Sequence, residues 1–356
     1  MNNQPVLSLK QLTKEESKSM AETKKISFWR SVHLAAVVAL LICLGSAASV
    51  EAQKVERITI AGGPPAGVFG IFATGIGTYL SKNVPGLDVS VAATGGSVEN
   101  TRRINAKEAE MGLSFSSDLH EAFYGLEKFT GKPLTELRSV GLVFFGVAHL
   151  ITYADSGIKT VGDLAGKRVA LGTPGSGTFA SAERVFRSVG LWDKITRIPL
   201  LGAAAGGAMS EGKADAFFWT GPEPDRVTSE AAAKRPVRAI DIYAPVSKTD
   251  FFKQFPYFAR YVFPAGSYRG ITEDTSTVGI PVIWYAHREF SPALVRKIAE
   301  AVYSKTGNAH MVSVHAGSRD MVPQKALQGV TVPLHRGAED LWRAGGIQIP
   351  EAIRAR

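Results

Sequence analysis

Cysteine is almost absent from this chain, since Cys43 is the only one among its 356 residues. Cys43 lies within an almost wholly apolar run, residues 32–44, and directly follows Ile42. The cysteine of a lipoprotein leader follows a small residue, so we do not expect Cys43 to carry a lipid. If the chain is cleaved beyond this run, the mature protein has no disulfide, no thiolate metal site and no cysteine nucleophile.

The sequence also lacks the compact patterns that mark common catalytic and metal sites. Its seven histidines include no H-E-x-x-H, and no acidic residue stands between His310 and His315, which are five residues apart. No G-x-S-x-G elbow occurs, and no basic run with interleaved aromatic residues indicates a nucleic-acid interface. We therefore expect a protein that is not an enzyme, needs no cofactor or metal and binds no nucleic acid.

Residues 1–52 have the three-part pattern of a secretory signal peptide. Residues 1–30 are polar and basic near their end, residues 32–44 are apolar, and small residues dominate 45–52. We place cleavage after Ala48 or Ala52 and expect the mature protein in the periplasm. A membrane anchor is the rival interpretation, but the apolar run is shorter than the ~20 residues that a membrane span needs.

The mature chain keeps a modest excess of positive charge. The whole sequence has a formal net charge of +9, and residues 1–52 contain six basic and four acidic residues, which leaves +7. Such a surface favours acidic ligands. The remaining length is sufficient for two domains.

Beyond residue 52, strand-like and helix-like segments alternate. We predict strands at 55–60, 87–92, 110–115, 168–171, 196–201, 214–219, 237–242 and 278–285. We predict helices at 68–80, 98–108, 179–189, 202–212, 223–233 and 292–303, with another opening at Ser116. Residues 138–153 are apolar and too long for one ordinary strand, so we predict two strands in succession there. The alternation indicates parallel-type sheets with covering helices, which bind ligands at the carboxyl ends of their strands.

A glycine-rich turn, residues 172–178, connects the predicted strand 168–171 to the predicted helix 179–189. Its glycines have the spacing of a nucleotide-binding P-loop, but Thr178 stands where that motif has lysine, so we exclude a triphosphate. Backbone N–H groups, the hydroxyls of Ser176 and Thr178 and the helix dipole favour an anion of lower charge, such as a carboxylate. The alternative is an ordinary capped turn between a strand and a helix.

Two further turns at strand ends also place hydroxyl groups at the start of a predicted helix. Residues 94–100 follow a predicted strand, and Ser97 is predicted to cap the helix 98–108. Ser116 and Asp118 open the next helix, where the carboxylate of Asp118 also suits a purely structural place at a helix start. We expect these turns to lie together at the carboxyl edge of a sheet.

With these segments in order behind a signal peptide, the chain resembles the TAXI-type solute receptors of tripartite ATP-independent periplasmic (TRAP) transporters, over about residues 55–350. The resemblance rests on the segments 59–69, 94–100, 113–118, 168–178, and 333–338 with 344–346. It implies a periplasmic-binding-protein-like α/β fold, in which two domains with parallel or mixed sheets are joined by a hinge and bind the ligand in the cleft between them. We expect domain I over 53–148 plus 276–356 and domain II over 149–275.

The resemblance also implies a ligand and a set of contacts. Family members bind small organic acids, such as glutamate or 2-oxoglutarate-like dicarboxylates, and deliver them to a TRAP-type membrane permease driven by an ion gradient. The implied contacts are Gly67, Phe69, Ser97, Asn100, Ser116, Asp118, Thr173, Ser176, Gly177, Thr178, Trp219 and Thr220. In this scheme Ser176 and Thr178 hold the carboxylate, and Phe69 and Trp219 form apolar walls.

The first turn departs from the family. Members usually carry Gly-Gly-Thr followed by two aromatic residues, whereas this chain has Ala66, Gly67, Val68, Phe69 and Gly70. The loss of one hydroxyl donor and one ring predicts a roomier and less polar site there. We still expect a monomeric binding protein. The alternatives are a periplasmic ligand sensor for a membrane signalling partner and a secreted enzyme with its active site in the cleft.

Overall fold

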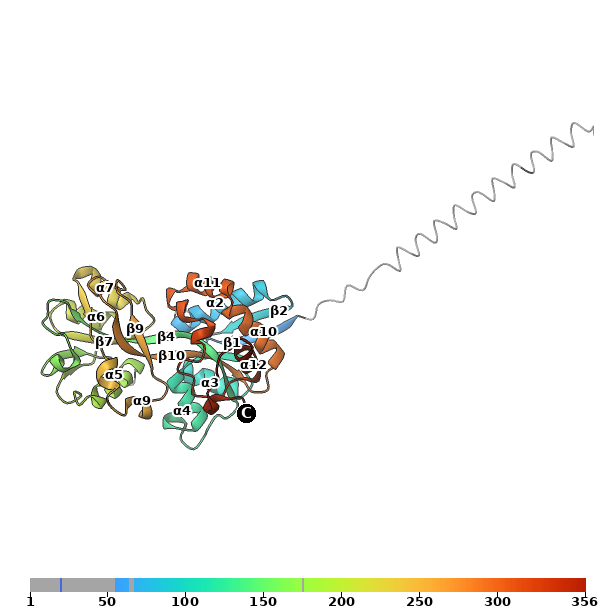
Figure 1. Cartoon of the computed structure of the whole chain (residues 1–356), viewed down its shortest axis with the longest axis horizontal. Coiled ribbons are helices and arrows are strands. Elements are labelled where there is room, and N and C mark those ends of the chain that lie inside the picture. Colours follow the sequence, from blue (N-terminus) through green and yellow to red (C-terminus); the bar gives the residue numbers. More distant parts are fainter. Residues whose placement is uncertain (1–19, 21–54, 64–66, 175) are drawn as a thin grey trace, which may run out of the picture. The chain divides into compact units, whose positions relative to one another are not determined.

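The computed structural model describes Met20 and residues 55–63, 67–174 and 176–356. The predicted signal peptide apart from Met20, residues 53–54, residues 64–66 of the first turn and Gly175 lie outside these described residues. Val55–Arg356 forms one compact unit, drawn in Figure 1. Among the described residues, no helix combines the length and apolar character needed to cross a membrane.

One mixed sheet of ten strands runs through this unit, in the order β2-β1-β3-β10-β4-β7-β5-β6, with β8 paired to β4 and β9 paired to β10. The strands are β1 (Glu56–Ala61), β2 (Leu87–Ala92), β3 (Met111–Phe115), β4 (Leu137–Tyr153), β5 (Arg168–Ala170), β6 (Thr196–Ile198), β7 (Ala216–Gly221), β8 (Val237–Ala239), β9 (Ala259–Phe263) and β10 (Thr275–His287). The predicted strand positions are confirmed, but the two parallel-type sheets expected from the alternation are joined into one sheet by antiparallel pairing of β4 and β10.

The prediction of two successive strands in the apolar stretch 138–153 is wrong. This stretch forms one continuous strand, β4, which is buried along its full length. β4 pairs with β10 over residues 137–147 and with β7 and β8 over residues 147–153. Because it finds partners along its whole length and is covered on both faces, the strand can far exceed the usual length. Figure 1 shows β4 and β10 running together between two groups of elements.

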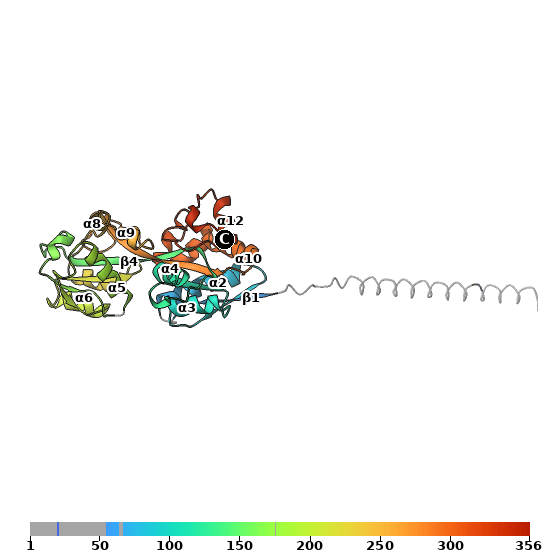
Figure 2. The same ribbon diagram turned by 90° about the horizontal axis from the view of Figure 1, so that it is seen from below.

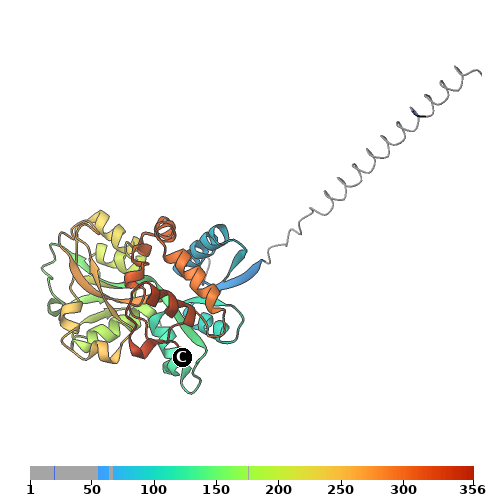
Figure 3. The same cartoon turned by 45° about the vertical axis from the view of Figure 1, so that its right-hand side comes forward.

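Helices pack around these strands (Figures 2 and 3). The α-helices are α2 (Val68–Asn83), α3 (Ser97–Asn105), α4 (Ser116–Tyr124), α5 (Gly177–Ser188), α6 (Ala203–Ser210), α7 (Arg226–Lys234), α8 (Tyr243–Val246), α9 (Phe251–Gln254), α10 (Pro292–Tyr303), α11 (Lys305–Val314) and α12 (Arg336–Ala344). Short 3-10 helices occur at η1 (Glu127–Phe129), η2 (Val161–Leu164), η3 (Ala316–Asp320), η4 (Pro323–Lys325) and η5 (Glu351–Ile353).

The buried apolar residues divide into clusters that define two lobes. One cluster lies in the first lobe, which we define as residues 55–144 and 282–356. Two further clusters lie almost wholly in the second lobe, residues 145–280. Because β4 and β10 run through both lobes, the chain crosses between them on paired strands. The domain limits given in the sequence analysis stay predictions.

The C-terminal segment 333–338, one of the segments that carry the family resemblance, has a structural role. The backbone N–H of His335 donates to the Ser139 carbonyl of β4 at 2.8 Å, and Nδ1 of His335 accepts from the Gly337 N–H at 3.2 Å. A Cβ atom on Gly337 would lie 2.0 Å from the Pro292 carbonyl oxygen, so only glycine fits where α12 packs against α10. The segment therefore fastens α12 to the first lobe.

Candidate ligand-binding site

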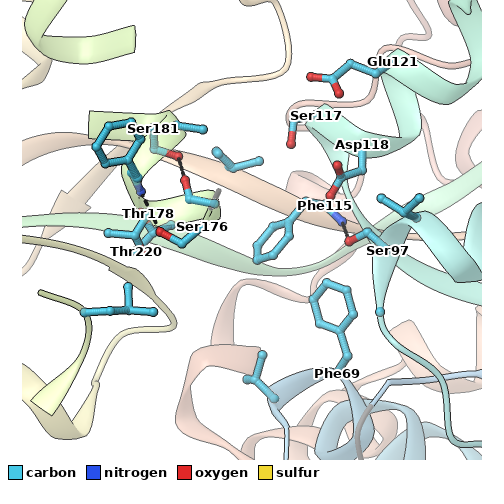
Figure 4. A pocket seen from close by; sticks show the side chains of 18 of the residues that line it. Phe69, Ser97, Phe115, Ser117, Asp118, Glu121, Ser176, Thr178, Ser181 and Thr220 are labelled. Atoms are coloured by element: carbon cyan, nitrogen blue, oxygen red, sulfur yellow. Dashed lines mark hydrogen bonds between the residues drawn. The ribbon is translucent and has the colours of Figure 1, made fainter. Parts of the chain in front are cut away.

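A cavity of about 770 Å³ lies between the carboxyl-end turns of the two lobes. Its volume falls within the range of small-molecule sites. The first lobe contributes residues near the starts of α2, α3 and α4, and the second lobe contributes the start of α5 and the end of β7. Figure 4 shows the Phe69 and Phe115 rings between Ser176 and Thr178 of the second lobe and Ser97 and Asp118 of the first.

Four helices direct their N-terminal ends to this cavity, and each follows a strand of the sheet. The helices α2, α3, α4 and α5 begin after Gly67, Gly96, Phe115 and Ser176, and all four residues line the cavity. Gly96 has φ 106°, a conformation that favours glycine. Since helix N-termini carry free N–H groups and partial positive charge, the geometry favours an anionic ligand.

The helix α5 begins at Gly177, two residues before the predicted start, and its first turn is capped as in the alternative of an ordinary strand-to-helix turn. Ser176 caps the helix, because its Oγ accepts from the Phe179 N–H at 3.1 Å, and its O–H remains able to donate. Gly172 has φ 92°, and a Cβ there would lie 2.9 Å from both the Phe179 nitrogen and the Ser176 Oγ. Thr178 is 6% exposed and lines the cavity. The glycine-rich turn thus places two hydroxyl groups at the N-terminus of α5.

The start of α3 differs from the prediction. The helix begins at Ser97 and ends at Asn105, with Gly96 as its cap residue, so Ser97 is not the N-cap of a helix 98–108. The Ser97 Oγ instead accepts from the Phe115 N–H at 3.1 Å. Ser97 therefore connects the starts of α3 and α4 while it faces the cavity.

Asn100 is a structural residue whose side chain does not line the cavity. It is fully buried, and its Oδ1 accepts from the Thr94 hydroxyl at 2.6 Å. Its Nδ2 donates to the carbonyls of Gly62 and Leu113 at 2.9 and 2.8 Å. These bonds join the turns after β1 and β2 to strand β3, and no donor of the amide is left for a ligand.

The structure brings together most of the contacts that the resemblance implied. Of the twelve implied contacts, nine line the cavity: Gly67, Phe69, Ser97, Asp118, Ser176, Gly177, Thr178, Trp219 and Thr220. Asn100, Ser116 and Thr173 are not among them. The Ser116 hydroxyl donates to the Tyr257 carbonyl at 3.0 Å, and Thr173 is exposed and accepts from the Ser176 N–H at 3.0 Å. Ligand contact at the lining residues stays a prediction.

Charged residues from both lobes meet at one side of the cavity. Lys128 Nζ lies 2.5 Å from Asp118 Oδ1 and 3.8 Å from Glu121 Oε2. Arg184 of α5 reaches across from the second lobe, and its Nη2 lies 3.2 Å from Glu121 Oε1. The Arg184 guanidinium also lies over the rings of Phe255 and Tyr257, at 5.3 and 5.5 Å. Burial raises the pKa of Glu121, whose side chain is 7% exposed, against the opposing effect of Lys128 and Arg184.

The sequence analysis missed several lining residues, above all Phe115, Ser117, Glu121 and Arg184. Helical spacing could have found two of them. Glu121 follows Asp118 by three positions on α4, and Arg184 follows Gly177 by seven positions on α5, so each shares a face with a predicted contact. That Glu121 and Arg184 pair across the cavity could not be predicted, because the contact forms only in the tertiary structure and leaves no local pattern in the sequence.

A buried group of ionisable side chains lies in the second lobe, outside the cavity lining. A buried pair joins His149 Nε2 to Asp225 Oδ2 at 2.9 Å, with the Tyr268 hydroxyl 3.0 Å from the same carboxylate. Burial would raise the pKa of Asp225, but His149 and Thr228 lower it to about 2. None of these residues lines the cavity. Among the described residues, no group of histidine, cysteine and acidic side chains is arranged to hold a metal ion.

Two lobes crossed by paired strands, with strand-end turns around a shared cavity, are the architecture of the two-domain, periplasmic-binding-protein-like solute-binding proteins. The chain belongs to the NMT1-like family, which it matches over residues 60–346. Its structure is similar to a TctC solute binding protein from Polaromonas, with a TM-score of 0.50 and 17% identity over 82% of this chain and 98% of that one. It is also similar to the periplasmic aliphatic sulphonate binding protein SsuA from Escherichia coli, with a TM-score of 0.47 and 17% identity over 82% and 90% of the two chains.

Proposed function

We propose that this protein is a periplasmic solute-binding protein that captures a small organic acid between its lobes and delivers it to a membrane permease of the TRAP type. The observation that carries the proposal is the convergence of four helix N-termini, from both lobes, on one cavity. Such an arrangement binds an anion, and closure of the lobes would remove it from water.

The TRAP-type permease comes from the resemblance to TAXI-type receptors. The same resemblance supports a dicarboxylate or amino-acid-like ligand of the glutamate or 2-oxoglutarate class. We propose that the protein acts as a monomer after removal of residues 1–52. The cavity supports the proposed binding of an anion, whereas the proposed delivery to a permease depends on the family resemblance.

The Thr178 hydroxyl provides the first test. We expect Thr178→Val to weaken binding of an organic anion about 10-fold or more, because a hydrogen bond to a charged group contributes about 1.5–3 kcal/mol. Titration calorimetry of the mature chain with a panel of organic acids measures the change. Thr228→Val is the matched control, since Thr228 is fully buried away from the cavity and its hydroxyl has no partner among the described residues.

Ser176 needs a different control, because it also caps α5. Ser176→Ala should weaken binding and also lower the free energy of unfolding by about 1 kcal/mol through loss of the cap. Ser291 caps α10 in the same way, accepting from the Leu294 N–H at 3.3 Å away from the cavity. Ser291→Ala should therefore reproduce the loss of stability without the loss of affinity. Unchanged affinity in a Ser176→Ala, Thr178→Val double variant would show that the start of α5 is not the anion site.

A further inference from the structure

The cationic side chains that line the cavity are Lys128 and Arg184, and both already have carboxylate partners. Lys128 pairs with Asp118 at 2.5 Å, and Arg184 pairs with Glu121 at 3.2 Å. Glu183, the remaining charged lining residue, pairs with Arg187 at 2.8 Å. The lining side chains therefore offer no uncompensated cation to a ligand.

At two of the four helix N-termini, an acidic residue compensates the partial positive charge of the helix. The first turn of α3 contains Glu99, whose Oε2 accepts from the Gly95 N–H at 2.7 Å, and the first turn of α4 contains Asp118. The first turns of α2 and α5 contain no acidic residue. A helix N-terminus carries about half an elementary charge, so these two ends together match about one negative charge. They belong to opposite lobes, which suits one carboxylate shared between them.

Hydroxyl groups are available to the same carboxylate. Thr178 lies in the first turn of α5, and Ser117 of α4 is 8% exposed. The Ser117 hydroxyl forms no hydrogen bond with other described residues and lines the cavity, where Figure 4 shows it on the side facing α5. This hydroxyl is therefore open to the cavity and can donate to a ligand carboxylate.

Part of the remaining wall is apolar, although Ser97, Ser181 and Thr220 also line the cavity. The Phe69 and Phe115 rings lie 5.1 Å apart between the two lobes, and Leu201, Trp219 and Ile280 add to this surface. A second carboxylate placed against these apolar side chains would lose its water without gaining a charged partner. Placed toward α4, it would face Asp118 and the buried Glu121, both of which repel it.

We propose that the cavity selects an organic anion with one negative charge on an apolar body, and discriminates against dicarboxylates and amino acids. The inference rests on the proposed capture of a small organic acid, and it replaces the dicarboxylate or amino-acid-like ligand that the family resemblance implied. It also agrees with the first turn, where Val68 and Gly70 replace more polar or aromatic family residues. Zwitterions are disfavoured because Asp118 and Glu121 already hold cations and leave no free carboxylate for an ammonium group.

Matched ligands test this selection by titration calorimetry on the mature chain. Octanoate and octanedioate differ only in a second terminal carboxylate, and 3-phenylpropanoate differs from phenylalanine only in the α-ammonium group. We expect each monoanion to bind at least 10-fold more tightly than its partner. Tighter binding of octanedioate, 2-oxoglutarate or phenylalanine would overturn this inference and leave the proposed function standing. Binding of none of these acids would overturn both.

A variant tests the cause. Asp118→Asn together with Glu121→Gln leaves Lys128 and Arg184 unpaired, so the ratio of octanoate to octanedioate affinity should fall at least 10-fold. The control is Asp193→Asn with Glu211→Gln, two exposed ion-paired carboxylates outside the cavity, which should leave the ratio unchanged. An unchanged ratio in a folded Asp118→Asn, Glu121→Gln protein, or in the folded Glu121→Gln single variant, would refute the assignment of selectivity to these pairs.

Discussion

Replacement of Arg184 by methionine removes the cation that joins the second lobe to the buried Glu121. At 3.2 Å and an effective dielectric constant of about 20, the direct attraction is about 5 kcal/mol before desolvation. Breaking a fully buried pair costs about 3–5 kcal/mol. Here Lys128 remains 3.8 Å from Glu121 and Arg184 is 22% exposed, so we expect a loss of about 2 kcal/mol in the free energy of unfolding at pH 7.5.

The loss of stability caused by Arg184→Met should be larger at neutral pH than at acidic pH. The pKa of Glu121 in the folded protein lies above its ordinary value because of burial. Proton uptake by Glu121 therefore favours the folded state at low pH, and this contribution is lost as the pH rises through the folded pKa. Removal of Arg184 raises that pKa further. The deficit of Arg184→Met should therefore be largest at pH 7.5 and smaller at pH 5.

Urea unfolding of the parent and of three variants measures this change in stability: Arg184→Met, Arg184→Met with Glu121→Gln, and Arg226→Met. Arg184→Met with Glu121→Gln removes the uncompensated charge and should recover at least half of the lost stability. Arg226→Met is the control, since Arg226 forms an exposed pair with Glu230 at 3.4 Å and should change stability by less than about 0.5 kcal/mol. The reasoning is refuted if Arg184→Met is as stable as the parent at pH 7.5, or if the double variant is no more stable than Arg184→Met.

Three further predictions concern the scaffold. Gly337→Ala should lower the free energy of unfolding by about 2–3 kcal/mol, because the added Cβ would overlap the Pro292 carbonyl. The control Gly207→Ala, at a helix position with open space around it, should raise the free energy of unfolding by up to about 1 kcal/mol. Equal stabilities of the two variants in urea would contradict this. Burial lowers the pKa of His335 to about 4, so stability should be full above pH 6.5 and fall by up to about 3 kcal/mol toward pH 4; a titration of stability against pH checks this, and His335→Gln should remove most of that slope. Asn100→Leu should lower the free energy of unfolding by about 3 kcal/mol or more, because the buried hydroxyl of Thr94 and the carbonyls of Gly62 and Leu113 lose their partner. A variant that melts at the same temperature as the parent would count against this.

Much of the fold could be predicted because it depends on local patterns. The strand 87–92 is observed at the predicted residues, and a helix follows the glycine-rich turn as predicted, although it begins two residues earlier, where Ser176 caps it. The stretch 138–153 could not be resolved locally. Its length as one strand depends on β10, which is more than a hundred residues away in the sequence and pairs with it.

The candidate site could be predicted in outline for a similar reason. Turns at strand ends are visible in sequence and predict that Ser97 and Thr178 lie near one edge of the sheet, whereas Phe69 comes from the family resemblance; all three line the cavity. Sequence could not distinguish Asn100, which has the position of a ligand contact but uses its hydrogen bonds to hold two turns and strand β3 together. Nor could it show that Arg184 meets Glu121, since that pair forms only when two lobes are packed together.

The most direct test of the central claim is a crystal structure of the mature protein with the organic acid that binds it most tightly. The account predicts that the ligand carboxylate lies about 3 Å from the N–H groups of Gly177 and Thr178 at the start of α5. It also predicts that the ligand body lies against Phe69 and Phe115, in contact with both lobes. A carboxylate bound elsewhere, or a ligand held by one lobe through Lys128 alone, would contradict the account.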